Sequence, residues 1–304
     1  MESQCLGLAE ILGVEPVVKR IQLRKPWCWL PPSLMLAPLS ALGNGGDKLM
    51  PPWPDLLISS GRLAVEPAIA VRRSSGGATF CVQLQDPTVS TNHFDLVATP
   101  THDRLKGANV ISTLGAMHGI TPARLVDEAK QTPQRLGGLP RPLVTVLLGG
   151  DNRAYRFTPA VAQVLGRDLA CLARNDGVGV VVTPSRRTGA HVLQALRSAL
   201  EGLPAIIWDG TGDNPYFSFL AQADVLVVTS DSVNMVSEAA ATGKPVFVVD
   251  LEGGSHKFSR FHANMRAAGI TRRFTGQLDY WTYQRPDDTE RVAGEIRCHM
   301  GLIS

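Results

Sequence analysis

Strand-like apolar runs alternate with helical patterns along this chain, and this alternation constrains the fold more than any other feature. Leu143–Leu148 and Val225–Thr229 are short and almost wholly apolar. Such runs are typical of strands buried on both faces of a parallel sheet. Parallel strands need crossover connections, which are usually helices. The sequence therefore predicts an α/β fold built from parallel sheets.

The alternation occurs twice, which indicates two Rossmann-like lobes. In the first half we predict helices over Cys5–Leu12, from the Ser60-Gly61 turn through about Arg73 and from Thr121, and strands over Pro16–Leu23, Asp55–Ser59, Thr79–Leu84, Asp95–Ala98 and Asn109–Thr113. In the second half we predict strands over Leu143–Leu148, Val178–Thr183, Ala205–Trp208, Val225–Thr229 and Pro245–Leu251, and helices from Thr158 and over Thr188–Leu200, Asn214–Ala223, Val233–Thr242, Lys257–Ala268 and Asp287–Met300.

The Gly- and Pro-rich segment Leu136–Pro142 is the best interlobe linker. We therefore predict an N-terminal lobe over residues 1–138, a C-terminal lobe over residues 139–284 and a C-terminal helix over residues 285–304. A doubly wound lobe normally opens with a strand, whereas this chain opens with a helix. Either the first lobe is unusual, or its first, central strand is missing from this sequence, which would open a gap in the sheet.

Composition sets limits on function. The 304 residues are 44% apolar and 19% charged, with a net charge of +3, which indicates a globular protein and gives no reason to expect nucleic acid. The five cysteines are dispersed and lack CxxC spacing, so we expect reduced thiols. No Asp-x-Asp, HExxH or clustered histidines are present, and we predict no bound metal and no cofactor. The expected location is cytoplasmic, with peripheral attachment to the inner membrane as an extension.

Polar clusters follow several predicted strands, where ligands of open parallel sheets bind. The cluster Gly149-Gly150-Asp151-Asn152 follows the first strand of the second lobe. Its two glycines would let the backbone approach an anion closely, and the helix start that follows would favour the negative charge. The alternative is a plain glycine turn, which is at least as common after a strand. Arg186 and Arg187 follow the next strand and suit phosphate oxygens. The alternative for that pair is a solvated helix start.

The segment Thr229–Leu251 carries the strongest signal. Ser232 is placed to cap a helix that Gly243 ends in a left-handed conformation. Asn234 and Glu238 lie four residues apart on one helical face. Glu238 is therefore predicted to accept hydrogen bonds from two sugar hydroxyls such as those of ribose. The alternative is an exposed helical glutamate.

The pattern Ser232…Glu238-Ala239…Gly243-x-Pro245 resembles the donor motif of GT-B glycosyltransferases. More closely, the chain resembles a bacterial family related to the plant "elongated mitochondria" fission factor. The motifs that carry this resemblance are Ser60-Gly61-Arg62, Gln85-x-Pro87, Pro100-x-His102-Asp103, Thr113-Leu114-Gly115, Gly149-Gly150-Asp151-x-Arg153, Ser185-Arg186-Arg187-Thr188, Asn214-Pro215-Tyr216, Ser230-Asp231-Ser232-x-Asn234 and Gly253-Gly254-Ser255-x-Lys257. The segment Glu2–Glu10 resembles one that in the family follows a first strand and a glycine loop.

The resemblance implies a nucleoside diphosphate sugar as ligand. Gly150 and Asp151 would lie near the diphosphate, and Glu238 would take the ribose. The cationic side chains would be Arg186, Arg187 and Lys257, and the donor phosphate or sugar would contact Ser230, Asp231, Ser232 and Asn234. Helix dipoles and cations would stabilise the departing diphosphate without a metal.

A general base would come from the first lobe. Asp86, His102 and Asp103 follow its strands, and Gln85 could orient an acceptor. The alternative for His102-Asp103 is a structural hydrogen bond.

The apolar segment Trp27–Leu42 is interrupted by prolines and follows four cationic residues between Lys19 and Lys25. It suits a membrane surface carrying a lipid-linked acceptor, or an insertion packed on its own lobe.

Three functions fit these patterns: a GT-B-type glycosyltransferase, a nucleotide-sugar epimerase on the same scaffold, and a non-catalytic adaptor. The base, the sugar, the acceptor and the oligomeric state are not indicated by the sequence.

Overall fold

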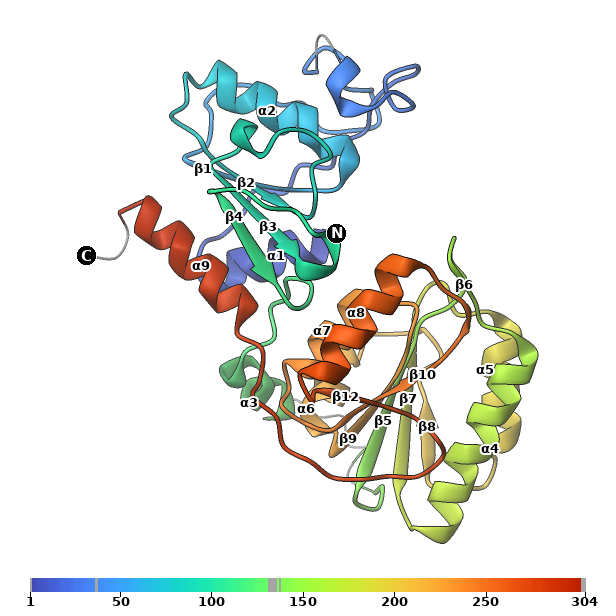
Figure 1. Ribbon diagram of the computed structural model, residues 1–304. Helices are drawn as coiled ribbons and strands as arrows, with labels where there is room; N and C mark the ends of the chain where they lie inside the picture. Colours follow the sequence, from blue (N-terminus) through green and yellow to red (C-terminus); the bar gives the residue numbers. More distant parts are fainter. Residues whose placement is uncertain (1, 36–37, 131–135, 137, 302–304) are drawn as a thin grey trace. The chain divides into compact units, whose positions relative to one another are not determined.

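The computed structural model describes residues 2–35, 38–130, 136 and 138–301. It divides into two compact units, Met1–Gly119 with Asp287–Ser304, and Ile120–Pro286. Figure 1 shows both units, each of which is described by itself below. Each unit is a parallel sheet covered by helices, so the predicted α/β fold with two Rossmann-like lobes is confirmed.

The first unit contains one four-stranded parallel sheet in the order β1-β2-β3-β4. The strands are β1 (Leu56–Ser60), β2 (Phe80–Leu84), β3 (Leu96–Pro100) and β4 (Val110–Thr113), with short 3-10 helices at Pro32–Leu34, Arg62–Ala64, Thr91–His93 and Thr101–Asp103. Helix α2 (Val65–Ser74) packs Val65, Ala68 and Ile69 on one face of this sheet. Helices α1 (Glu2–Leu12) and α9 (Asp288–His299) pack together beside the other face, with Leu8 and Ile296 in a common core.

One prediction for the first unit is wrong. The strand predicted over Pro16–Leu23 does not form, because its residues are mostly exposed and only Leu23 pairs, in an isolated antiparallel bridge with Leu42. The four strands are contiguous in the sheet, with β1 at one edge, so the sheet of the described residues has no gap in its middle. No strand precedes α1 within the described part of the chain.

The second unit contains a six-stranded parallel sheet in the order β12-β10-β9-β5-β7-β8. The strands are β5 (Leu143–Leu148), β7 (Gly179–Pro184), β8 (Ala205–Ile207), β9 (Val225–Thr229), β10 (Val246–Val249) and β12 (Thr271–Arg273). The helices are α3 (Pro122–Lys130), α4 (Pro159–Asn175), α5 (Ala190–Ala199), α6 (Tyr216–Gln222), α7 (Val233–Ala240) and α8 (His256–Ala267). A small antiparallel ladder joins β6 (Tyr155–Arg156) to β11 (Glu252–Gly253). Neither β12 nor this ladder was predicted.

The predicted domain boundary at residue 138 moves to residue 119, because α3 packs against α6 and so belongs to the second unit. Gly137, within the predicted linker, lies outside the described residues. The C-terminal helix belongs to the first unit. Its Asp288 carboxylate accepts hydrogen bonds from the backbone N–H of Leu114 at 2.7 Å and of Gly115 at 3.2 Å, which ties α9 to the end of β4.

Candidate functional site

The sheet of the second unit reverses its winding between β5 and β9. From β5 the chain proceeds to β7 and β8 on one side, and β9, β10 and β12 then continue on the other. Ligands of open α/β sheets bind beyond the carboxyl ends of the strands at such a switch point. Gly149 follows β5 and Ser230 follows β9, so two of the predicted loops meet there.

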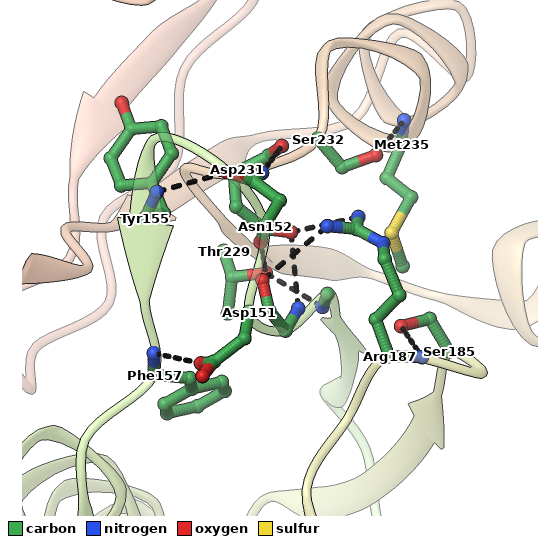
Figure 2. Close-up of polar contacts among 12 residues, drawn as sticks. Asp151, Asn152, Tyr155, Phe157, Ser185, Arg187, Thr229, Asp231, Ser232 and Met235 are labelled. Carbon is green, nitrogen blue, oxygen red and sulfur yellow. Dashed lines mark hydrogen bonds and ion pairs between the residues drawn. The ribbon is translucent and has the colours of Figure 1, made fainter. Parts of the chain in front are cut away.

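The Asp231 carboxylate lies at the centre of the contacts at this switch point (Figure 2). Its residue is 3% exposed. The hydroxyl of Thr229 donates to Oδ1 at 2.7 Å, and the backbone N–H of Gly150 donates to Oδ2 at 3.0 Å. Nη2 of Arg187 lies 2.8 Å from the same Oδ2. Three loops are therefore joined through one buried carboxylate, and Asp231 is a residue that holds the site together.

The glycine turn after β5 is packed too closely for any side chain. A Cβ on Gly149 would lie 2.0 Å from Oδ1 of Asp231, and a Cβ on Gly150 would lie 2.0 Å from the Arg187 carbonyl oxygen. The N–H of Gly149 donates to the Thr229 hydroxyl at 2.7 Å. Both glycine N–H groups thus donate to groups of the protein itself. The glycines let the backbone of this turn lie close to Asp231 and Arg187, where a close approach to an anion had been predicted.

The loop after β7 is fastened to the same turn by Thr188. Its Oγ1 lies 2.5 Å from the Gly149 carbonyl oxygen and accepts a hydrogen bond from the N–H of Ser185 at 2.9 Å. Arg187 is therefore directed toward Asp231. Its neighbour Arg186 is exposed and makes no hydrogen bond or ion pair within the described residues, so this guanidinium remains available to an anion.

Asn152 orders the remainder of the turn. Its Oδ1 accepts hydrogen bonds from the N–H groups of Ala154 at 2.7 Å and Tyr155 at 2.9 Å, and its Nδ2 donates to the Asp231 carbonyl at 3.2 Å. The preceding Asp151 is exposed at its carboxylate, where Oδ1 accepts from the N–H of Phe157 at 2.8 Å. A carboxylate that already caps a local N–H and carries negative charge is a poor direct ligand for a diphosphate.

The loop after β9 rests on α8. Nε2 of His262 lies 2.8 Å from the carbonyl oxygen of Ser230, and because a carbonyl only accepts, this nitrogen carries the proton. Burial lowers the pKa of His262, which favours the neutral ring. The Ser230 hydroxyl accepts from the N–H of Leu251 at 3.0 Å. Both the carbonyl and the hydroxyl of Ser230 are thus used in contacts within the protein. The predicted cation Lys257 is exposed and lies in the first turn of α8.

Helix α7 begins at Val233, as predicted. The Ser232 hydroxyl accepts from the N–H of Met235 at 3.3 Å, which confirms the predicted cap, and Gly243 has the expected left-handed φ of 75°. Asn234 and Glu238 lie four residues apart in the helix and are both half-buried. The predicted face is therefore formed.

Glu238 is paired with a residue to which the sequence reading gave no role. The hydroxyl of Tyr216, the first residue of α6, donates to Oε2 of Glu238 in a short hydrogen bond. Burial raises the pKa of Glu238 to about 7, although the Tyr216 hydrogen bond and the charge of Arg124 oppose the rise. The pKa of Tyr216 is raised well above its usual value, first by burial and then by the Glu238 charge, so the phenol is the donor.

The first unit holds the three candidate bases. Oδ1 of Asp86 accepts from the N–H of Thr88 at 2.8 Å in a local turn. His102 is 2% exposed, its Nε2 lies 3.8 Å from Asp103, and the Asp103 carboxylate accepts from the Thr99 hydroxyl at 3.0 Å. At 3.8 Å the distance from His102 to Asp103 is too long for a hydrogen bond, and a base at these positions stays a prediction. Gln85, at the end of β2, has a strained φ of 74°.

Four polar residues that organise the site were given no role of their own from the sequence. They lie at a strand end, at a helix start or in the loops between: Asn152, Thr188, Tyr216 and Thr229. A threonine that closes an apolar strand and a tyrosine after Asn-Pro are the signals that were available.

Comparison with known proteins places the chain in a family. The model of a family described as mitochondrial fission ELM1 matches residues 1–300. The chain belongs to the mitochondrial fission ELM1 family. It is 34% identical over 271 residues to the mitochondrial fission protein ELM1 of Arabidopsis thaliana, with 80% of this chain and 63% of the plant protein covered. The chain thus spans less than two thirds of that ELM1 relative. It is 24% identical to an uncharacterized protein of Rickettsia prowazekii, over 83% of this chain and 80% of that protein.

Among solved structures, this ELM1 family member is similar to the UDP-GlcNAc 2-epimerase of Methanocaldococcus jannaschii. The TM-score is 0.55 at 9% identity, with 81% of this chain and 77% of the epimerase covered. At that identity the likeness shows the fold alone, which is a GT-B-like pair of Rossmann-like lobes. Within the described residues no helix is long and apolar enough to cross a bilayer.

Proposed function

We propose that this chain binds a nucleoside diphosphate sugar at the carboxyl edge of the second unit's sheet and transfers the sugar to an acceptor without a bound metal. The observation that carries the proposal is Glu238, a half-buried carboxyl on the helix that starts at the switch point. A carboxyl oxygen there is placed to accept hydrogen bonds from a ribose, which is the role that GT-B enzymes give to the equivalent glutamate.

The diphosphate would lie over the turn and the start of α7. Arg186 supplies an exposed guanidinium, and Lys257 an exposed ammonium at the start of α8. Arg187 is committed to Asp231, so it would act through that pair by holding the loop in place. The N-terminus of α7 and these cations would stabilise the charge that develops on the leaving diphosphate.

The acceptor would bind on the first unit, which would supply the general base from Asp86, His102 or Asp103. A lipid-linked acceptor at a membrane surface fits the segment around Trp29, which is 69% exposed and carries the Lys25 ammonium 5.3 Å from its ring centroid. Buried Leu23, Met35 and Ala41 pack the same segment into a small core of its own.

Titration calorimetry with UDP-, GDP- and ADP-linked sugars and the free nucleoside diphosphates tests the donor site. We expect the wild type to bind at least one of them, and Glu238→Gln to bind it about tenfold more weakly, since the amide oxygen of Gln accepts hydrogen bonds without the negative charge that strengthens them. Glu201→Gln, at an exposed loop position, is the matched control and retains wild-type affinity. Absence of binding to any of these compounds contradicts the proposal.

Arg186→Met separates the diphosphate from the nucleoside. We expect a loss of affinity for nucleoside diphosphates and none for the corresponding nucleoside, because only the former carries the charge. The control is Arg174→Met, an exposed arginine of α4. Equal losses for nucleoside and diphosphate would show that Arg186 supports the fold and not the anion.

A non-catalytic binding role is the second candidate. It is favoured by the engagement of the Gly149 and Gly150 N–H groups with Thr229 and Asp231, which leaves fewer backbone donors for a departing diphosphate. Release of free nucleoside diphosphate in the presence of an acceptor extract supports transfer. Solvent deuterium that enters the sugar without an acceptor supports epimerisation instead, and binding without either reaction supports the non-catalytic role.

A further inference from the structure

Tyr216 and Glu238 form a pair between two helices that start at the same edge of the sheet. Helix α6 follows β8 and opens with Tyr216, and α7 follows β9 and carries Glu238 in its second turn. The phenol hydroxyl occupies Oε2 of the carboxyl. Oε1 accepts no hydrogen bond within the described residues and is not sealed from solvent. Oε2 of this carboxyl is therefore used within the protein, and Oε1 can accept hydrogen bonds from a ligand.

The phenol is itself held in place. Tyr216 packs edge-on against Phe217, with ring centroids 5.3 Å apart, and the Arg124 guanidinium of α3 lies 3.8 Å from the centroid of Phe217. The Tyr216 N–H donates to the Asn214 side chain at 3.1 Å. A hydroxyl fixed by packing and backbone contacts can hold its partner in one rotamer, which a freely rotating glutamate would not keep.

We propose that Tyr216 is a positioning residue, which holds Oε2 of Glu238 so that Oε1 is presented to the vicinal 2′- and 3′-hydroxyls of a ribonucleoside diphosphate. This inference rests on the proposed donor site. One carboxyl oxygen has two lone-pair directions and can accept from both hydroxyls of a cis-diol. A 2′-deoxyribose would lose one of these bonds, so the pair makes the site selective for ribose.

A rival geometry makes the opposite prediction. If a diol hydroxyl took the lone-pair direction of Oε2 that the Tyr216 hydroxyl uses, it would displace the phenol, and the phenol would compete with the ligand. Removal of the hydroxyl would then tighten binding. A purely structural hydrogen bond would leave the preference for ribose unchanged, because ribo and deoxyribo ligands would be affected equally.

The experiment measures the affinities of UDP, ADP, GDP and CDP and of their 2′-deoxy forms for the intact wild type, Tyr216→Phe and the control Tyr280→Phe. Tyr280 is 58% exposed and its hydroxyl makes no hydrogen bond within the described residues. We expect the wild type and the control to prefer the ribo form of the best ligand by about five- to tenfold, the value of about one hydrogen bond. Tyr216→Phe should bind that ribo form more weakly and prefer it by less than about twofold.

A second measurement follows the carboxyl itself. In Tyr216→Phe the pKa of Glu238 should rise above its wild-type value of about 7, because the lost hydrogen bond favours the charged form, and carbon NMR of labelled glutamate reads this directly. A preference for ribose that survives in Tyr216→Phe, or tighter binding by this variant, overturns the inference while the donor site stands. A wild type that binds none of the nucleotides removes both.

Discussion

Nη2 of Arg187 lies 2.8 Å from Oδ2 of Asp231, and this ion pair joins the loops after β7 and β9 at the point where the sheet reverses its winding. The carboxylate side chain is fully buried, whereas the guanidinium is 41% exposed. The same carboxylate accepts hydrogen bonds from Gly150 and Thr229. Asp231 therefore organises the candidate site from within, and the ligand surface must be formed by its exposed neighbours.

Asp231→Ala should destabilise the protein by about 3 kcal/mol, because it leaves the Gly150 N–H and the Thr229 hydroxyl without their acceptor in a buried place. Chemical denaturation measures the free energy of unfolding. The control is Asp250→Ala, which breaks an exposed pair with Arg273 at 2.9 Å and should cost less than about 1 kcal/mol. Equal costs for the two variants would contradict the central place of Asp231.

Gly149→Ala should also destabilise the protein, by about 2 kcal/mol or more, because the added methyl group would lie 2.0 Å from Oδ1 and 2.3 Å from Oδ2 of Asp231. Gly294→Ala is the matched control, since Gly294 lies inside α9 with nothing within 4 Å of its Cβ direction. That control should raise stability by about 0.5–1 kcal/mol through helix propensity. Thermal melts of both variants measure the difference, and a neutral Gly149→Ala would show that the turn is looser than described.

Glu238 makes stability depend on pH in a defined direction. Its pKa is about 7 in the folded protein and 4.5 in an unperturbed glutamate, so the folded state binds the proton more tightly between these values. The free energy of unfolding therefore falls as the pH rises from 4.5 to about 7, by up to about 3 kcal/mol from this group. Glu238→Gln lacks this titration.

The measurement is the free energy of unfolding of the wild type and of Glu238→Gln across this pH range. The difference, variant minus wild type, should increase with pH through the window and become constant above about pH 8. A difference that does not change with pH would mean that the carboxyl is solvated like an ordinary surface glutamate.

Much of the second unit could be predicted from the sequence, and the reason lies in its burial. Val225–Thr229 is buried at every position. A strand that is buried on both faces has an almost unbroken run of apolar residues in its sequence, and such a run is easy to recognise. The cap by Ser232 and the left-handed Gly243 were equally accessible, because each depends on a single residue type in its local place.

The rest depended on contacts between distant residues. The residues of Pro16–Leu23 were predicted to form a strand, yet a strand needs a neighbouring ladder and these residues lack one. The roles of Asp231 and Arg187 were predicted as ligand contacts, and only the fold shows that they face each other. The pairing of Tyr216 with Glu238 spans 22 residues and leaves no local pattern.

Arg62 should hold the backbone around Cys28–Leu30, in the segment before β1, in its place. Its Nη1 donates to the Leu30 carbonyl at 2.9 Å and its Nη2 to the Cys28 carbonyl at 2.8 Å. Arg62→Met should leave the melting temperature within a few degrees of wild type, because both carbonyls can turn to water, but should speed amide exchange around Trp27–Leu30. Arg73→Met, an exposed arginine of α2, is the control. Unchanged exchange in this segment would exclude Arg62 as its anchor.

The donor site is tested most directly by calorimetric titration of the intact protein with nucleoside diphosphates and their sugars, with Glu238→Gln and Glu201→Gln beside the wild type. The account predicts saturable binding of one nucleoside diphosphate to the wild type and to Glu201→Gln, and about tenfold weaker binding to Glu238→Gln. A wild type that binds none of these nucleotides, or a Glu238→Gln variant that binds them as tightly as wild type, would contradict it.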